Sequence, residues 1–197
     1  MTTAVAANPR TKTWTRQEYY QMADLGWFNG QRAELVEGEI FVLSPQNFRH
    51  SSAVDRAFRV IDRAIGSRYW VRAQLPMQAG PTSEPEPDIS AVPGQRDDYT
   101  DHPEQAVLVV EVSDSTVYFD RKRKASLYAS RNIQDYWVLN LVDDQLEVFR
   151  NPKPDSTATS QASYDLPIIL KRGDAINPLA DTTISIRVDD LLGRRAS

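Results

Sequence analysis

Apolar residues recur along this chain at two spacings, and the helical one is clearest between residues 50 and 65. Val54, Ala57 and Ile61 fall at the i, i+3 and i+7 positions of one helical face, with charged residues on the other face. Gly66 follows the last periodic residue, where helices commonly end. The pattern predicts one long amphipathic helix.

Three shorter helices have weaker signals. Residues 15–18, Thr-Arg-Gln-Glu, have the order of a capping box, which predicts a helix that runs toward Leu25. A basic stretch at residues 120–128 has helical spacing, and we expect Asp120 to be the N-cap residue of this helix. Residues 189–192 predict a last helical turn.

Strand patterns occupy most of the remaining chain. Residues 107–112 are the strongest case, because five apolar, mostly β-branched residues around one glutamate are typical of a strand buried on both faces. Glu37-Gly38 and Asp143-Asp144 are turn sequences between apolar runs, so each predicts a hairpin. The predicted strands are 33–36, 40–43, 69–77, 88–92, 107–112, 136–142, 146–150 and 184–188.

Length and composition narrow the class of protein. A chain of 197 residues is long enough for one domain with a sizeable core. We expect a disordered tail over residues 1–12 and a single domain over 13–197, with its core at 13–150 and a polar linker at 151–163. No apolar run approaches the length of a membrane span, so we expect a cytoplasmic protein without membrane contact.

Charge and cysteine content exclude some chemistries. The net charge of −4 argues against nucleic-acid binding by the whole surface, so any DNA contact must be local. The chain has no cysteine, which excludes disulfides and thiolate metal sites. His50 and His102 are the only nitrogen ligands for Zn²⁺. Oxygen ligands, and therefore a hard cation such as Mg²⁺, fit the sequence better.

The candidate chemistry centres on Glu111, a carboxylate inside a buried strand. An unpaired charge there costs several kcal/mol, about 2–7 for a polar group and more for an ion, so Glu111 needs a partner. Asp88 opens the preceding strand, and Lys124 shares a helical face with inward-pointing apolar residues. Two acids and a lysine can hold a divalent cation and a phosphate.

Each of these residues also has a structural interpretation. Asp88 can cap a local backbone N–H, and Glu111 can form a buried ion pair with Arg72 or another arginine. Lys122 and Arg123 are expected to face solvent. Two carboxylates held together without metal should also repel, so we expect a divalent cation, or the substitution Asp88→Asn, to stabilise the protein.

Several of these residues together resemble a known family. Pro87-Asp88, Glu111, Lys124 and the segment 136–138, preceded by Glu34 in a Glu-Leu-Val-Glu-Gly-Glu run, look like the bacterial "putative restriction endonuclease" family of the PD-(D/E)XK nuclease superfamily. The resemblance spans roughly residues 13–150. It implies an α/β domain of restriction-endonuclease-like fold, in which a central mixed β-sheet is flanked by helices.

The resemblance also implies site residues and a cofactor. In that superfamily the aspartate and the glutamate bind Mg²⁺, for which Mn²⁺ commonly substitutes, and a lysine two positions after the glutamate orients or activates water. That position is Ser113 here, and Lys124 is the natural replacement from the helix. Glu34 and His50 are further candidate metal ligands, although a capping or solvent-facing role is the commoner one for a histidine at the start of a helix. Asp120, expected mainly as a helix cap, is a secondary candidate.

The expected function is therefore Mg²⁺-dependent hydrolysis of DNA phosphodiester bonds, with Asp88, Glu111 and Lys124 as catalytic residues. Two alternatives remain open: a non-catalytic binding or assembly module on the same fold, and a hydrolase of a small phosphodiester. The sequence also leaves open a homodimer.

Overall fold

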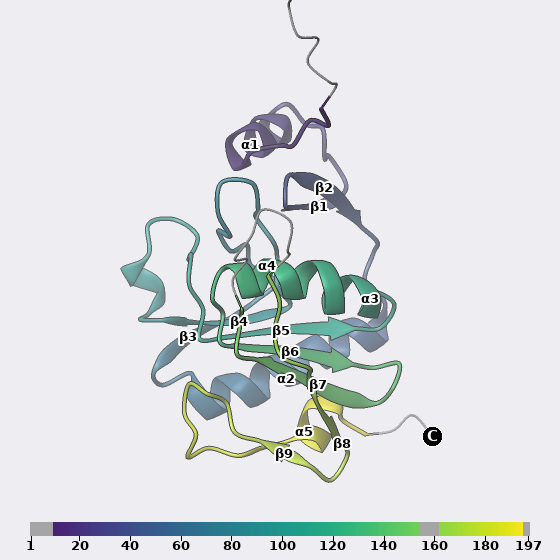
Figure 1. The fold of residues 1–197 in the computed structure, drawn as a ribbon, viewed down its shortest axis with the longest axis vertical. Helices are drawn as coiled ribbons and strands as arrows, with labels where there is room; N and C mark the ends of the chain where they lie inside the picture. The colour runs from purple at the N-terminus through teal and green to yellow at the C-terminus, as the bar shows by residue number, and fades with distance from the viewer. Residues whose placement is uncertain (1–9, 154–161, 195–197) are drawn as a thin grey trace, which may run out of the picture.

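A six-stranded mixed sheet forms the centre of this computed structural model, which describes residues 10–153 and 162–194 (Figure 1). The strands lie in the order β3-β4-β5-β6-β7-β8, and β5 and β6 are the one parallel pair of neighbours in this sheet. Their bounds are β3 Tyr69–Ala73, β4 Ile89–Pro93, β5 Leu108–Ser113, β6 Asp135–Asn140, β7 Gln145–Arg150 and β8 Ile168–Lys171.

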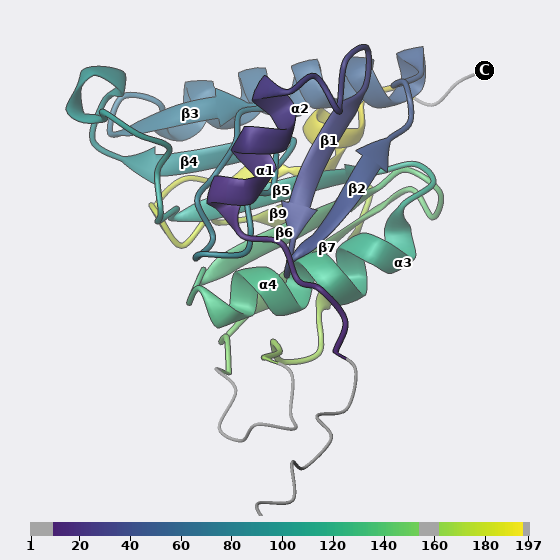
Figure 2. The same ribbon diagram turned by 90° about the horizontal axis from the view of Figure 1, so that it is seen from above.

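Helices cover both faces of this sheet (Figure 2). The long helix α2 (Phe48–Ile65) packs on one face, and α5 (Val188–Leu192) lies beside it in the same apolar cluster. The other face is covered by a helical run made of α3 (Val117–Phe119), the π-helix η2 (Asp120–Lys124) and α4 (Ala125–Ser130). The predicted mixed sheet flanked by helices is confirmed.

Helix α1 (Arg16–Asp24) and the two-stranded sheet of β1 (Arg32–Val36) and β2 (Glu39–Leu43) form a smaller unit outside the six-stranded sheet. Helix α1 begins at the predicted capping box, in which the Thr15 side chain and Glu18 exchange hydrogen bonds with each other's backbone N–H. The predicted hairpin follows as β1 and β2, a separate antiparallel pair. Glu37 and Gly38 both have positive φ, as the tight turn between these strands requires.

The alternation of side chains along β5 decides which of them face the site. Leu108, Val110 and Val112 pack in the cluster under α2. Val109 packs in the cluster on the opposite face, under α4, so Glu111 and Ser113 point to that side as well. A buried carboxylate is thereby directed at the helical run 117–130.

The long amphipathic helix was predicted correctly, and the structure shows why it ends where it does. Ala57, Ile61 and Ile65 are fully buried against the sheet, and Gly66 is the C-cap residue. Asn47 is the N-cap residue, and its side chain accepts a hydrogen bond from the His50 N–H at 2.9 Å. This cap fixes the start of α2 next to the C-terminal end of β5.

Four sequence predictions differ from the structure. β3 ends at Ala73 rather than at residue 77, because Gln74 takes a positive φ and leaves the strand direction. Val188 begins α5 instead of ending a strand. β8 and the two-residue strand β9 (Ala175–Ile176), which pairs with β10 (Ile186–Arg187), were not predicted. Asp120 is not an N-cap residue, since it lies inside the helical run.

A short 3₁₀ helix, η1 (Arg96–Asp98), completes the elements. Residues 1–9 of the predicted tail 1–12, and residues 154–161 of the predicted linker, lie outside the described residues. Among the residues that the structure describes, no helix combines the length and the apolar character needed to cross a membrane.

Candidate active site

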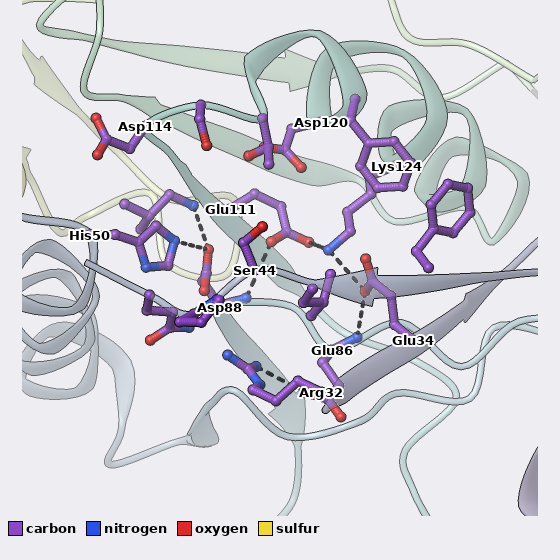
Figure 3. A pocket seen from close by; sticks show the side chains of 18 of the residues that line it. Arg32, Glu34, Ser44, His50, Glu86, Asp88, Glu111, Asp114, Asp120 and Lys124 are labelled. Carbon is purple, nitrogen blue, oxygen red and sulfur yellow. Dashed lines mark hydrogen bonds and ion pairs between the residues drawn. The ribbon is translucent and has the colours of Figure 1, made fainter. Parts of the chain in front are cut away.

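A cavity of about 300 Å³ lies where the hairpin β1–β2 meets the end of β5 (Figure 3). Its walls come from the hairpin, the start of α2, the segment before β4 and the start of the helical run. All the candidate residues from the sequence line this cavity: Glu34, His50, Asp88, Glu111 and Lys124. The structure therefore brings together side chains that are up to 90 positions apart in the sequence.

Asp88 lies directly before β4, and three groups hold its carboxylate. The Val112 N–H donates to Oδ2 at 2.9 Å, and the Gln74 side chain donates to Oδ1 at 3.1 Å. His50 Nε2 lies 3.3 Å from Oδ2. Burial acts to raise the pKa of Asp88, but His50 and the Val112 N–H outweigh it, so this pKa lies below its ordinary value. Asp88 is thus held ionised.

Glu111, on β5, receives three hydrogen bonds in the same cavity. Lys124 Nζ donates to Oε1 at 3.0 Å, the Tyr128 hydroxyl donates to Oε1 at 2.8 Å, and the Asp88 N–H donates to Oε2 at 3.3 Å. Burial raises the pKa of Glu111 to about 8, although the Lys124 ammonium opposes this shift. The strand that follows Asp88 and the strand that contains Glu111 are neighbours, since β4 pairs with β5. The alternative ion pair between Glu111 and Arg72 is not present.

Lys124 is buried at the end of the π-helix η2. The Ala125 N–H bonds to the Asp120 carbonyl five residues back, which is the π-type hydrogen bond. Asp120 and Lys124 are the buried residues of this turn, and the exposed Lys122 lies between them. Lys124 Nζ lies 3.0 Å from Glu111 Oε1 and 3.1 Å from Glu34 Oε2. Burial lowers the pKa of Lys124, but Glu111 and Glu34 raise it well above its ordinary value.

Glu34 contacts Lys124, and His50 contacts Asp88. Glu34, on β1, contacts Lys124 and accepts a hydrogen bond from the Glu86 N–H at 3.2 Å. His50 contacts Asp88, which raises the pKa of the imidazole although burial acts to lower it. The dashed contacts in Figure 3 therefore run as one chain from His50 through Asp88, Glu111 and Lys124 to Glu34.

Asp120 also lines the cavity, whereas the sequence favoured a helix cap for it and gave a place at the metal site only as the secondary role. Ser113 Oγ donates to Asp120 Oδ2 at 2.5 Å and Thr116 Oγ1 donates to the same oxygen at 2.7 Å. Burial raises the pKa of Asp120, although Lys124 opposes the shift. The available signal was the spacing of Asp120 and Lys124, four residues apart on one helical face.

One wall of the cavity is apolar. Phe41, Leu43 and Pro45 come from β2 and the segment after it, and Phe119 comes from α3. The rings of Phe41 and Phe119 meet edge to face, with centroids 4.8 Å apart. The cavity thus pairs a charged wall with an aromatic one.

Comparison with known proteins identifies the family of this chain. The family model "Uma2: Putative restriction endonuclease" matches residues 16–183. The chain belongs to this family. No curated protein matches the sequence significantly.

One solved structure agrees with this assignment at the level of the fold. The Uma2 chain is similar to the crystal structure of a "putative nuclease belonging to DUF820" from Anabaena variabilis, with 14% sequence identity and a TM-score of 0.59. That match covers 81% of this chain and 89% of the other. A second match, to the type IIG restriction endonuclease BpuSI, has 19% identity and a TM-score of 0.35, and covers 61% of this chain and 13% of the other.

Ser113 is the main departure of this Uma2 chain from the superfamily pattern described above. It lies two residues after Glu111, where the pattern has lysine, and its hydroxyl contacts Asp120. Lys124 approaches Glu111 from the helical run instead. The ammonium group beside Glu111 therefore comes from the helical run, because β5 itself contains no lysine or arginine.

The carboxylate oxygens that line the cavity are the type of ligand that a hard divalent cation prefers. Asp88 and Glu111 offer carboxylate oxygens to one cavity, and Mg²⁺ uses one or two carboxylates together with waters and substrate oxygens. Among residues 10–153 and 162–194, no three or more His, Cys, Asp or Glu side chains are grouped so as to hold a metal ion. A cation at this place would use the two central carboxylates and would compete with Lys124 for Glu111.

Proposed function

We propose that this Uma2 protein is a Mg²⁺-dependent endonuclease that hydrolyses DNA phosphodiester bonds, with Mn²⁺ able to replace Mg²⁺. Asp88 and Glu111 would hold the ion, and Lys124 would be the catalytic lysine. The observation that carries the proposal is the Lys124 ammonium, 3.0 Å from Glu111 inside the cavity that Asp88 also lines. Carboxylates next to a buried cation are suited to a phosphodiester and a metal-bound water.

The state of Lys124 defines what it can do. Its pKa is raised well above the ordinary value by Glu111 and Glu34 against the effect of burial, so it remains an ammonium at neutral pH. It cannot act as a general base. It can instead stabilise negative charge that develops on a phosphate oxygen, an effect worth about 3–4 kcal/mol for one well-placed donor. When bound, Mg²⁺ would polarise the phosphate and lower the pKa of an attacking water.

Glu34 and His50 are positioning residues in this proposal. Glu34 contacts Lys124 at 3.1 Å, so the ammonium keeps a partner if Glu111 turns toward the ion. His50 Nε2, together with the Val112 N–H, holds Oδ2 of Asp88 and fixes the carboxylate orientation. Both side chains lie among the lining residues of the cavity, yet neither has to touch the substrate.

Plasmid nicking in Mg²⁺ or Mn²⁺ tests the proposal, with Lys122 as the matched control for Lys124. Lys122 lies two residues away on the same π-helix but is exposed. We expect Lys124→Ala to lose about 10²–10³ in rate and Lys122→Ala to retain near wild-type activity. Lys124→Gln, which keeps a hydrogen-bond donor, serves if the alanine variant melts early. Equal activity of the Lys122 and Lys124 variants would refute the role of Lys124.

The same assay separates the two other functions. Hydrolysis of a chromogenic phosphodiester without DNA cleavage would favour a small-molecule hydrolase. A well-folded wild type that cuts neither substrate in Mg²⁺ or Mn²⁺ would favour the binding or assembly module.

A further inference from the structure

The reactive groups of the candidate site lie at the bottom of a cavity rather than on an open surface. Asp88, Glu111 and Lys124 are 8%, 3% and 6% exposed, respectively. The cavity above them has a volume of about 300 Å³. A phosphate that reaches these groups is displaced from the surface of a stiff base-paired duplex, and this displacement costs least where the strand is unpaired.

The hairpin β1–β2 forms the cover of this cavity and is tied down on both sides. Its turn bonds to two other segments, through the Trp14 N–H to the Gly38 carbonyl at 2.9 Å and the Gly38 N–H to the Thr82 carbonyl at 2.7 Å. Arg123, on the π-helix, forms an ion pair with Glu37 at 3.1 Å. Leu35, in β1, is fully buried. The cover is an integral part of the fold.

The apolar part of the cavity lining suits a base or a sugar. Phe41 from the hairpin and Phe119 from α3 meet edge to face, and Leu43 and Pro45 also line the cavity. Aromatic faces stack on unpaired bases of any sequence, and this stacking is a common basis of single-strand binding. In a paired duplex those base faces are covered by their neighbours.

The two segments that border the cavity also carry exposed aromatic side chains. Phe48 is 86% exposed and lies next to the lining residue Asn47 at the start of α2. Tyr118 is 78% exposed and lies between the lining residues Thr116 and Phe119. Exposed aromatic residues on both bordering segments can stack on the nucleotides that flank the one inside the cavity.

The charges around the cavity do not match a duplex backbone. Binding to duplex DNA depends on arginines and lysines that neutralise several phosphates. The arginine that lines the cavity, Arg32, forms an ion pair with Glu86 at 3.0 Å, and Arg49 near its border forms one with Asp114 at 2.7 Å. The chain as a whole carries a net charge of −4.

We propose that the cavity takes an unpaired nucleotide between its acidic and aromatic walls, so that the substrate is single-stranded or locally unpaired DNA rather than an intact duplex. This inference rests on the proposed nuclease function and specifies its substrate class. Phe48 and Tyr118 contact the strand on either side of the reacting nucleotide.

The test compares three labelled DNAs of related sequence in Mg²⁺ or Mn²⁺: an unstructured single strand, the fully paired duplex, and a duplex with an internal unpaired stretch. We expect the single strand to be cut at least about tenfold faster than the duplex, since unpairing costs a few kcal/mol. Cuts in the third DNA should fall within its unpaired stretch. Equal or faster cleavage of the intact duplex would overturn the inference and leave the nuclease function standing.

If none of the three DNAs is cut, the proposed nuclease function is wrong. A DNA-binding measurement then tests the preference for unpaired DNA separately. Fluorescence anisotropy in Ca²⁺ should give a Kd for the single strand at least about tenfold below that for the duplex, as expected where stacking dominates. Equal or tighter binding of the duplex would overturn the inference.

Variants of the bordering aromatics provide a third test with a matched control. Phe48→Ala and Tyr118→Ala should each weaken single-strand binding about fivefold or more, which is the lower end of one lost stacking contact. Trp27, 63% exposed in the turn after α1 and not among the lining residues, is the control, and Trp27→Ala should bind like wild type. Unchanged binding by both Phe48→Ala and Tyr118→Ala would remove these residues from the strand path and count against the inference.

Discussion

Among the residues that the structure describes, Lys124 and Arg72 are the two buried cationic side chains, and they are held in opposite ways. Lys124 contacts the carboxylates of Glu111 and Glu34 at 3.0 and 3.1 Å. Arg72, on the edge strand β3, has no ion-pair partner among the described residues. Its Nη2 donates to the Pro76 carbonyl at 2.8 Å, and its guanidinium lies over the Trp70 ring, 4.8 Å from the centroid. Nε and Nη1 have no hydrogen-bond partner there.

The pKa values diverge accordingly. Burial lowers the pKa of Arg72, and no carboxylate offsets it. Burial acts in the same direction on Lys124, but its carboxylates reverse the shift. Arg72 therefore behaves as a long side chain that fills space next to a tryptophan, whereas Lys124 is the common partner of a charge network. Removing the two cations should have very different consequences.

The largest expected difference is in stability. Lys124→Met leaves Glu111 and Glu34 buried without their cation, and breaking a buried ion pair in this way costs about 3–5 kcal/mol. Arg72→Met loses one hydrogen bond and a cation–π contact but also removes a buried charge, so its effect should stay within about 1 kcal/mol. Urea unfolding in EDTA measures both. Similar losses in the two variants would mean that the carboxylates do not depend on Lys124.

A smaller expected effect is the stabilisation of the protein by bound Mg²⁺. At ten times its dissociation constant Mg²⁺ should stabilise the wild type by about 1.4 kcal/mol. For a domain of this size that raises the melting temperature by roughly 3–6 °C. Arg72→Met should keep the full response, because Arg72 does not line the cavity, and Glu111→Gln should lose most of it. A wild-type melting curve indifferent to Mg²⁺ and Mn²⁺ would instead assign both acids a structural role.

The sequence predicted those parts of the fold that depend on local pattern. Helix α2 and the hairpin β1–β2 follow from apolar spacing, a cap and a turn within a few residues of each other. β8 was missed because it is a four-residue edge strand after Pro167 that pairs with β7, on the far side of residues 151–167. Such pairing depends on long-range contacts that a local pattern does not contain.

The sequence indicated which residues form the candidate site, but it indicated fewer of the contacts between them. A glutamate in a buried strand required a partner, and this identified Asp88 and Lys124 as candidates. The spacing of Asp120 and Lys124 indicates a shared helical face, but the π-turn between them has no clear sequence signal, because it depends on one extra residue in the hydrogen-bond ladder. The contact of Glu34 with Lys124 depends on how the separate hairpin packs.

One expectation changes with these contacts. From the sequence, repulsion between two acids should make Asp88→Asn more stable than wild type. In the structure, Val112, Gln74 and His50 all favour the ionised form of Asp88. Of these two acids, Glu111 is the one whose pKa is raised. Glu111→Gln is therefore the substitution that relieves the cost of burying a charge.

Stability should consequently depend on pH. Glu111 has a pKa of about 8 in the folded protein against an ordinary value of 4.5, so between these values the folded state binds more protons than the unfolded state. Metal-free wild type should therefore lose stability as pH rises through this window. His50 contributes with the same sign, because its pKa is also raised.

The readout for Glu111 is therefore the difference between wild type and Glu111→Gln, measured as unfolding free energy in EDTA across the window. This difference should grow with pH and level off above pH 8, the folded-state pKa. Arg72→Met should retain the wild-type slope. A difference that stays constant with pH would show that Glu111 is already ionised throughout.

The smallest expected effect compares two buried serines, one near each cation. Ser113 Oγ donates at 2.5 Å to Asp120, which lines the cavity. Ser90, paired with Arg72 across β3 and β4, has a hydroxyl without a partner among the described residues. Ser113→Ala should cost about 0.5–1 kcal/mol, because it removes a hydrogen bond and leaves Asp120 with one donor fewer. Ser90→Ala should change stability little or raise it slightly, since it removes an unsatisfied buried group. Urea unfolding of the two variants measures both changes in unfolding free energy. A larger loss for Ser90→Ala would contradict this prediction and would show that the Ser90 hydroxyl contributes to stability.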